Sequence, residues 1–309
     1  MKSSHLKDSE WIVHLSLLLA VFIWGINYGI VKKALGDFLP LTFNGLRFAL
    51  ASCFLLIILI QQKKGIIKFK EDWLQFALAG FIGNFLYQIC FIYGLSWTLA
   101  GNTSLILAIS PVFVALFSKI SGQEKVRIRK WIGAFLSFAG IAFVVSGGRQ
   151  GFHLTSLTFK GDMTEFLAAV LWSVYIVLSA PLAKKYGSIT AVSMNLWIGL
   201  IFLIPFSIPS FIHQNWGLIT WQDWGALFYS AAFSIAVGRI LWYRGISRIG
   251  GTSTSVYSNL TPLIALLMAW VIVGEKPEWI QWAGAAAILS GVFLTGIKKK
   301  TEDLDGLKG

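Results

Sequence analysis

Polar and aromatic side chains occur inside several long apolar stretches of this sequence. An unpaired polar group in lipid costs several kcal/mol, so such side chains face other helices or a water-filled cavity. Helical spacing places Trp24, Asn27 and Tyr28 on one face, and aromatic rings beside amide groups suit a small amphipathic solute. The same rings would also attract a cation. The candidate binding residues are Trp24, Asn27, Tyr28, Asn44, Arg47, Tyr87, Gln88, Trp172, Tyr175, Asn195 and Ser258.

Each candidate also has a structural interpretation. Serine, threonine and amide side chains commonly bond one helix to another, which leaves both roles open. Arg47 lies well inside an apolar run, where it could extend outward to water, pair with backbone carbonyls or attract a substrate carboxylate. Arg239 is expected about one turn from the end of its helix, close enough to reach the membrane surface. Glu124 and Glu275 are expected at membrane-edge turns as capping or pairing groups.

Two prolines fall near the middle of apolar runs. Proline removes a backbone hydrogen bond and kinks a helix, so Pro111 and Pro262 are predicted to be bend points. They could act as hinges during transport, or they could form static kinks that shape the bundle.

The composition of the chain indicates that these residues lie in a membrane protein. The chain has 309 residues, of which 56% are hydrophobic and only 13% charged. About 20 apolar residues cross a bilayer as a helix, and the runs show no alternation typical of strands. The fold class is therefore an all-α integral membrane protein with ten transmembrane helices. The ten predicted helices span 12–31, 40–60, 73–93, 102–120, 130–147, 162–182, 190–208, 222–243, 252–273 and 279–297.

The loop charges predict the orientation. With the N-terminus inside, twenty Lys and Arg residues fall on the inner side and five on the outer side. This bias predicts that both termini are cytoplasmic in a multi-pass protein of the cytoplasmic membrane. Topology and lipid contact explain the net charge of +12, so no nucleic-acid partner is expected. Tryptophans near run ends, such as Trp11, Trp73, Trp221 and Trp279, are typical of the membrane interface.

The two halves of the chain resemble each other. At an offset of 151 residues, 12 of the 47 positions from 94 to 140 are identical, including Pro111 with Pro262 and Glu124 with Glu275. Trp24 matches Trp172 at an offset of 148. Because each repeat holds five helices, the second enters the membrane from the opposite side. Inverted repeats can rock about a shared midplane site, which predicts a secondary transporter. The expected domains are 1–148, 160–298 and a cytoplasmic tail at 299–309.

Several motifs occur in order and in duplicate. WGINYGIVKKAL, SPVFVALFSKISGQEK and WIGAFLSFAGIAFV in the first half have counterparts such as AVLWSVYIVLSAPLAKK and LTPLIALLMAWVIVGEK in the second. These segments resemble the EamA-type branch of the drug/metabolite transporter superfamily. The resemblance implies ten helices, both termini inside, and export or exchange of small metabolites, often amino acids.

Enzyme motifs, cofactor sites and acidic residues bear on the alternatives to a simple carrier. The sequence carries no motif of an intramembrane enzyme, and it indicates no cofactor or metal site. The acidic residues are all expected in loops, tails or near span ends, Glu165 being the deepest. This arrangement predicts facilitation or exchange without obligatory carboxylate-based proton coupling. A non-transporting scaffold or receptor and a channel-like facilitator remain alternatives. The expected partners are a small-molecule substrate and lipids, and the sequence leaves a homodimer open.

Overall fold

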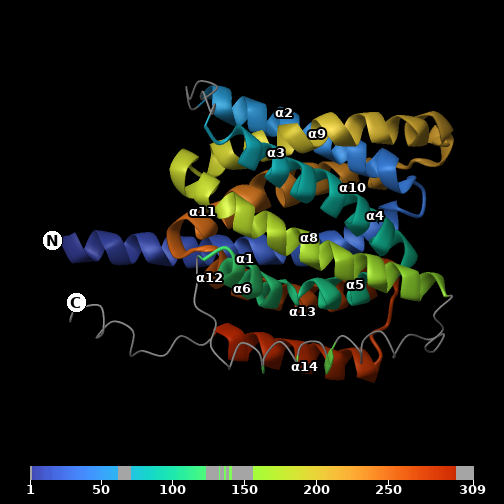
Figure 1. Ribbon diagram of the computed structural model, residues 1–309. Helices are drawn as coiled ribbons and strands as arrows, with labels where there is room; N and C mark the ends of the chain where they lie inside the picture. The colour runs from blue at the N-terminus through green and yellow to red at the C-terminus, as the bar shows by residue number, and fades with distance from the viewer. Residues whose placement is uncertain are drawn as a thin grey trace.

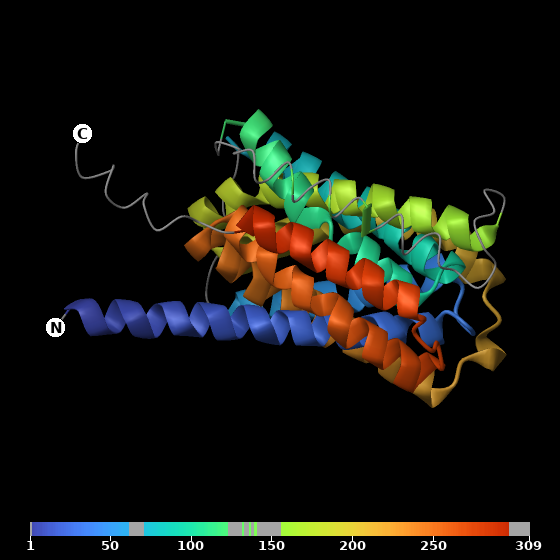
Figure 2. The same ribbon diagram turned by 90° about the horizontal axis from the view of Figure 1, so that it is seen from below.

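The computed structural model describes residues 2–61, 71–122, 132, 136, 139–140 and 156–296. The described part is helical, and its long helices lie side by side along one direction (Figures 1 and 2). Eight of its helical segments are long and apolar enough to cross a membrane. They are Trp11–Ala34, Pro40–Gln61, Trp73–Trp97, Ala100–Ile120, Leu157–Tyr186, Ser188–His213, Trp221–Ile249 and Gly251–Val273.

Some of these segments are continuous helices and others are composite. The first two are α1 (Lys2–Ala34) and α2 (Pro40–Gln61), and the later pair is α8 (Leu157–Tyr186) and α9 (Ser188–His213). The others combine α3 (Trp73–Phe81), η1 (Ile82–Leu86) and α4 (Tyr87–Trp97); α5 (Ala100–Leu107) and α6 (Ser110–Ile120); α10 (Trp221–Tyr229), η3 (Ser230–Val237) and α11 (Gly238–Ile249); and α12 (Gly251–Ser255), η4 (Val256–Leu260), α13 (Thr261–Met268) and η5 (Ala269–Val273). A short 3₁₀ turn, η2 (Trp216–Leu218), precedes α10.

These eight segments do not include the predicted helices at 130–147 and 279–297. The last one forms α14 (Trp279–Gly296), which packs against α5, α6 and η4. Most of the range 130–147 lies outside the described residues, so the count of ten stays a prediction.

Several helices extend beyond their predicted limits, and two of these extensions concern buried charged residues. α8 begins at Leu157 rather than 162, because Ser156 caps it by accepting a hydrogen bond from Phe159 N at 3.1 Å. The eighth span continues to Ile249 rather than 243, where Gly250 adopts a φ of 83° and ends the helix. Both extensions carry charged residues deeper into the bundle than the sequence pattern indicated.

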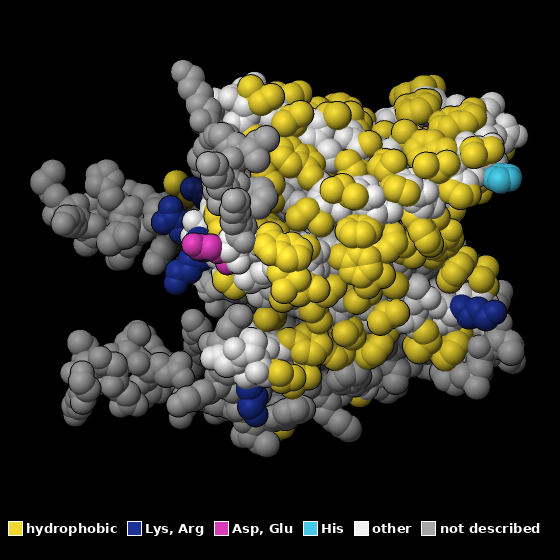
Figure 3. Space-filling view, turned by 45° about the horizontal axis from the view of Figure 1, so that its top comes forward, with side chains coloured by type: hydrophobic (Ala, Val, Ile, Leu, Met, Phe, Trp, Pro, Cys, Tyr) yellow, Lys and Arg dark blue, Asp and Glu magenta, His cyan; other side chains and the backbone are white. Residues whose placement is uncertain are grey.

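The outer surface suits a lipid environment. Hydrophobic side chains cover the middle of the face in Figure 3, while the coloured charged side chains lie toward its two ends. Trp11, Trp73, Trp221 and Trp279 lie at or near span starts with more than 60% of their surface exposed. The described part is therefore built as a multi-pass membrane bundle.

Helices of the two halves of the chain alternate in the bundle. α8 runs antiparallel along α3 and α4: Gln75 near the start of α3 donates to the Leu178 carbonyl at 2.7 Å, whereas Gly94 near the end of α4 lies against Glu165. α1 runs along α11 in the same manner, with Leu17 against Gly245. Figure 1 also shows that α1 and α8 point in opposite directions.

Hydrogen bonds made by the side chains of Lys32 and Glu275 connect helix ends. Lys32 Nζ donates to the carbonyl oxygens of Leu95, Ser96 and Thr98 at 2.6–3.1 Å, where α4 ends. Glu275 accepts from the backbone N–H of Ala100 at 2.8 Å and thereby caps the start of α5. Glu275 therefore has the predicted capping role, while Glu124 lies outside the described residues.

Candidate functional site

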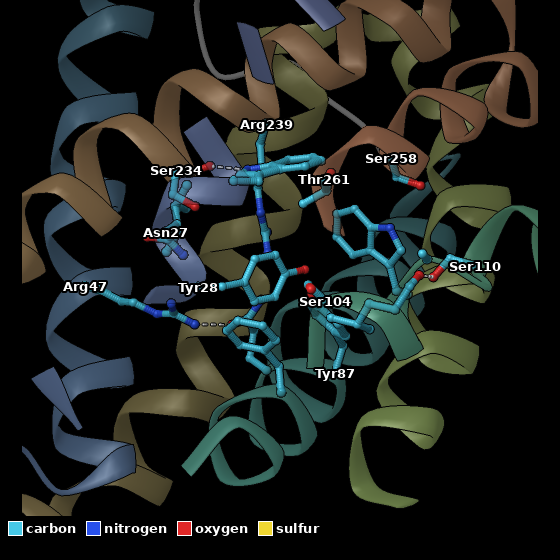
Figure 4. A pocket seen from close by; sticks show the side chains of 17 residues that line it. Asn27, Tyr28, Arg47, Tyr87, Ser104, Ser110, Ser234, Arg239, Ser258 and Thr261 are labelled. Carbon is cyan, nitrogen blue, oxygen red and sulfur yellow. Dashed lines mark hydrogen bonds between the residues drawn. The ribbon is translucent and has the colours of Figure 1, made fainter. Parts of the chain in front are cut away.

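A cavity of about 80 Å³ lies between the two halves of the chain (Figure 4). That volume holds several water molecules or a small solute group. Its wall is made by Trp24, Asn27, Tyr28, Arg47, Tyr87, Gln88, Phe91, Ser104, Leu107, Ala108, Ser110, Trp172, Ser234, Ile235, Arg239, Ser258 and Thr261.

Two interrupted helices border this cavity. α5 ends at Leu107 and α6 restarts at Ser110, while the 3₁₀ segment η4 separates α12 from α13. Pro111 and Pro262 are each the second residue of the restarting helix, where the missing N–H leaves no bond unmade. They therefore mark breaks rather than kinks within a continuous helix, and a hinge role for these breaks stays a prediction. Ser110 and Thr261, the residues just before them, both line the cavity.

A wall of aromatic rings lines one part of the cavity. Trp24 and Trp172 meet edge to face with their ring centroids 6.0 Å apart, and Tyr87 lies 5.1 Å from Trp172. Trp24 Nε1 also donates to the carbonyl of Ser234 at 2.9 Å. Ser234 belongs to the π-helix η3. The hydrogen bond fixes the ring, so the apolar wall is preorganised.

Arg47 approaches the cavity from α2 and is only 2% exposed. It donates to Asn44 Oδ1 at 2.8 Å, to Gln88 Oε1 at 2.7 Å and to Ser230 Oγ at 3.2 Å. Its hydrogen-bond acceptors are thus side chains rather than the backbone carbonyls that one sequence interpretation invoked. These bonds hold the guanidinium inside the bundle and exclude an outward-extended side chain.

Arg239 lines the same cavity, although the sequence pattern placed it near a helix end. It is 4% exposed and donates to Asn84 Oδ1. The expectation of an extended, surface-reaching side chain is wrong, because the helix continues ten residues past Arg239 to Ile249. The guanidinium instead packs near the rings of Phe48 and Trp172, at 5.4 and 5.8 Å from their centroids.

Eight of the eleven candidate binding residues line the cavity, and three stand behind its wall. Asn44 supports Arg47 and donates to the Gln88 carbonyl at 3.3 Å. Tyr175 packs against Trp172 with centroids 5.2 Å apart. Asn195 donates to Ser179 at 3.2 Å and to Tyr243 at 2.9 Å, away from the cavity. These three shape the site without facing it.

Two buried acceptors at the cavity wall have no hydrogen-bond partner among the described residues. They are Asn27 Oδ1 and Thr261 Oγ1. An unpaired buried polar atom is costly, and a bound solute or water would satisfy it. The wall therefore offers hydrogen-bonding positions beside its aromatic rings.

Two acidic residues lie deeper than expected. Because α8 begins at Leu157, Glu165 is its ninth residue and is fully buried. Its Oε1 accepts from Thr103 at 3.4 Å, while Oε2 has no partner among the described residues. Asp162, one turn earlier, accepts from Thr98 at 2.5 Å and from Asn102 at 3.3 Å. The expectation that every acidic residue lies in a loop, a tail or near a span end is therefore wrong.

Glu275 lies outside the spans at the edge of this acidic region, and burial raises the pKa of its carboxyl above the ordinary value. The positive charge of Lys32 opposes that rise.

Among the described residues, no three His, Cys, Asp or Glu side chains form a group that could hold a metal ion. The cavity wall offers rings, amides, hydroxyls and guanidinium groups, which can bind a solute.

Known proteins share this sequence pattern over nearly the whole chain. The profile of the EamA-like transporter family matches residues 11–146 and again 159–297. An uncharacterized transporter of Archaeoglobus fulgidus is 33% identical over 288 residues, covering 93% of this chain and 98% of the relative. The uncharacterized transporter YetK of Bacillus subtilis is 28% identical, covering 94% of this chain and 88% of the relative.

Two further comparisons add a named substrate class and a fold. A probable terminal-alkyne amino-acid exporter of Streptantibioticus cattleyicolor is 27% identical over 224 residues, covering 72% of this chain and 73% of the relative. A solved crystal structure superposes with a TM-score of 0.68 at 18% identity, covering 96% of this chain and 99% of the other. The superposition supports the fold alone.

Proposed function

Since the chain belongs to the EamA-like transporter family, we propose that it moves a small amphipathic, amino-acid-like metabolite across the cytoplasmic membrane by alternating access. Export or exchange is the proposed direction, with both termini in the cytoplasm. The observation that carries the proposal is the cavity at the meeting point of two broken helices, one from each half of the chain.

An inverted repeat is part of the proposal, and matched positions support it. Ser110 and Thr261 are 151 residues apart, as are Leu107 and Ser258, and all four line the cavity. The π-helix η1 at Ile82–Leu86 corresponds at the same offset to the last five residues of η3. Corresponding positions thus line the cavity, or form a π-helical turn, in both halves.

Matched helix contacts support it further. α4 packs along α8 as α11 packs along α1, which are the contacts that a two-fold axis would exchange. α2 packs on α9, as expected for a pair that lies on such an axis, and α5 packs on α13 as α12 packs on α6. Two halves related in this way can rock about the cavity and open it to each side in turn.

The cavity wall supports an amphipathic solute. Trp24, Trp172 and Tyr87 offer apolar surface, and Asn27 offers an unpaired acceptor for a donor on the solute. The probable terminal-alkyne amino-acid exporter of Streptantibioticus cattleyicolor, whose match covers 72% of this chain, supports an amino-acid-like cargo.

Counterflow in proteoliposomes tests the proposal. Vesicles that contain the purified protein are preloaded with an unlabelled amino acid or amino-acid analogue, and uptake of the labelled compound is followed for each member of a panel. We expect saturable uptake that the internal substrate stimulates. A channel-like facilitator would show flux without that stimulation, and a scaffold or receptor would show no flux with any compound. Either result would refute alternating access.

A further inference from the structure

Two buried guanidinium groups lie in the cavity wall, from α2 and α11 (Figure 4). Arg47 and Arg239 are 2% and 4% exposed. Both lie near the ring of Phe48, at 5.7 and 5.4 Å from its centroid. The two cations are therefore neighbours in a site that is largely shielded from solvent.

Neither guanidinium has an acidic partner in the described part of the chain. The acceptors around Arg47 are the neutral side chains of Asn44, Gln88 and Ser230, and Arg239 donates to neutral Asn84. The described residues that line the cavity include no aspartate or glutamate. The buried acids Asp162 and Glu165 accept from hydroxyl and amide groups elsewhere, as described above.

We infer that the cavity binds its solute as an organic anion, whose carboxylate is held by Arg47 and Arg239. The inference rests on the proposed function and names the charge class of its substrate. Two like charges in a site of low dielectric constant repel each other, and an anion between them relieves both the repulsion and the missing counter-charge. A planar guanidinium matches a carboxylate with two parallel hydrogen bonds.

The aromatic rings of the cavity wall indicate the chemistry of the rest of the solute. Trp24 and Trp172 would pack against an apolar or aromatic body of the solute. The sequence alone also permitted an organic cation over these rings, but two adjacent arginines without counter-charge oppose one. The expected ligand is thus a small organic acid with an apolar body.

Four ring-matched probes test this charge preference. The full-length protein in detergent is titrated with 3-phenylpropionate, L-phenylalanine, 3-phenylpropanamide and phenethylamine, and dissociation constants are derived from thermal shifts. We expect 3-phenylpropionate to bind at least about tenfold more tightly than the amide or the amine, as charge-assisted bonding requires. Equal or tighter binding of the amide or the amine would overturn the inference. Sodium sulfate that stabilises as well as 3-phenylpropionate would overturn the requirement for an organic body.

Substitutions test which residues carry the preference. Arg47→Gln and Arg239→Gln should each reduce the preference for 3-phenylpropionate over the amide by about tenfold. Arg248→Gln is the matched control, because Arg248 is an exposed arginine on the same helix as Arg239. An unchanged preference in both cavity variants, or an equal loss in Arg248→Gln, would contradict the assignment. If the cavity variants do not fold, the comparison of probes on the unaltered protein decides.

The outcome separates this inference from the transport function. Anion binding without counterflow of any probe would refute transport and leave the anion site standing. Counterflow of phenethylamine or the amide without that of 3-phenylpropionate would leave transport standing and refute the anion site.

Discussion

The indole rings of Trp24 and Trp172 meet edge to face at the cavity wall, with their centroids 6.0 Å apart. Trp24 comes from α1 and Trp172 from α8, which begin the two family repeats and run in opposite directions. The contact therefore joins the two halves at the candidate binding site. A motion of one half against the other must change this contact.

Removing one of these rings should weaken solute binding. Trp172→Ala removes aromatic surface from the wall, and we expect the KM for counterflow to rise by about tenfold, as loss of a ring contact of 0.5–1.5 kcal/mol together with its buried area implies. Trp172→Phe should have a smaller effect because it keeps a ring. Trp270→Phe is the control, since Trp270 is half exposed on the outer surface. Unchanged KM in Trp172→Ala would remove the ring from the proposed site.

The close packing of α4 on α8 depends on a glycine. A Cβ at Gly94 would come within 2.6 Å of Glu165 Oε1, which real side chains do not allow. We expect Gly94→Ala to lower the free energy of unfolding by about 1–3 kcal/mol, measured by denaturation in detergent. Gly225→Ala should be tolerated, because nothing lies within 4 Å of the added carbon. Shortening the neighbour with Glu165→Asp should restore part of the loss, and a failure to do so would mean that another contact causes it.

An ion pair joins the start of α3 to the end of α8. Lys185 Nζ lies 2.6 Å from Asp72 Oδ2, and this hydrogen bond, with one from Tyr186, lowers the pKa of the Asp72 carboxyl below its ordinary value. The folded protein then holds the proton less tightly than the unfolded chain, so the stabilisation is present at neutral pH and is lost as the pH falls below about 4.

The difference in Tm between the unaltered protein and Asp72→Asn should follow this dependence. It should be small and positive at pH 7, disappear in acid and shrink with salt, because the pair is at the surface. Glu71→Gln is the control, as the Glu71 side chain is 88% exposed and lies 3.5 Å from Lys185. A difference that grows in acid would contradict the assignment.

The buried carboxyl group of Glu165 makes proton coupling testable. Exchange without obligatory proton coupling stays the prediction, and counterflow should persist without a pH gradient and in Glu165→Gln. Glu165 lies two turns inside α8, so it is the group that would carry a coupled proton. Flux that requires a pH gradient, together with loss of that requirement in Glu165→Gln, would show that Glu165 carries the coupling proton.

The candidate site could be predicted in part because a few residue types are conspicuous in apolar runs. Trp24, Trp172 and Arg47 are costly or bulky inside a membrane, so their position alone draws attention. Ser104 and Ser110 could not be separated from serines that merely pack helices, because both kinds lie at similar depths.

The errors at helix limits have a physical reason. Arg244 and Arg248 are typical of the charged residues that follow a span, so the sequence predicts a span end close to Arg239. The helix instead continues to Ile249, and Gly250 ends it. Ser156 caps α8 outside the apolar run, so the helix begins at Leu157, and Asp162 and Glu165 are buried within the bundle. Hydrophobicity marks the lipid-facing length of a helix, whereas caps and tertiary hydrogen bonds determine where it begins and ends.

The central claim is that the two halves lie inverted across the membrane around one cavity. Single cysteines at Ser121 and Lys276, two exposed positions at the ends of corresponding segments, test it in a background of Cys53→Ser and Cys90→Ser. A membrane-impermeant maleimide is added to intact cells and to permeabilised cells. We predict labelling of Lys276→Cys in intact cells and of Ser121→Cys only after permeabilisation. Labelling of both from the same side would contradict the inverted architecture and the alternating access that depends on it.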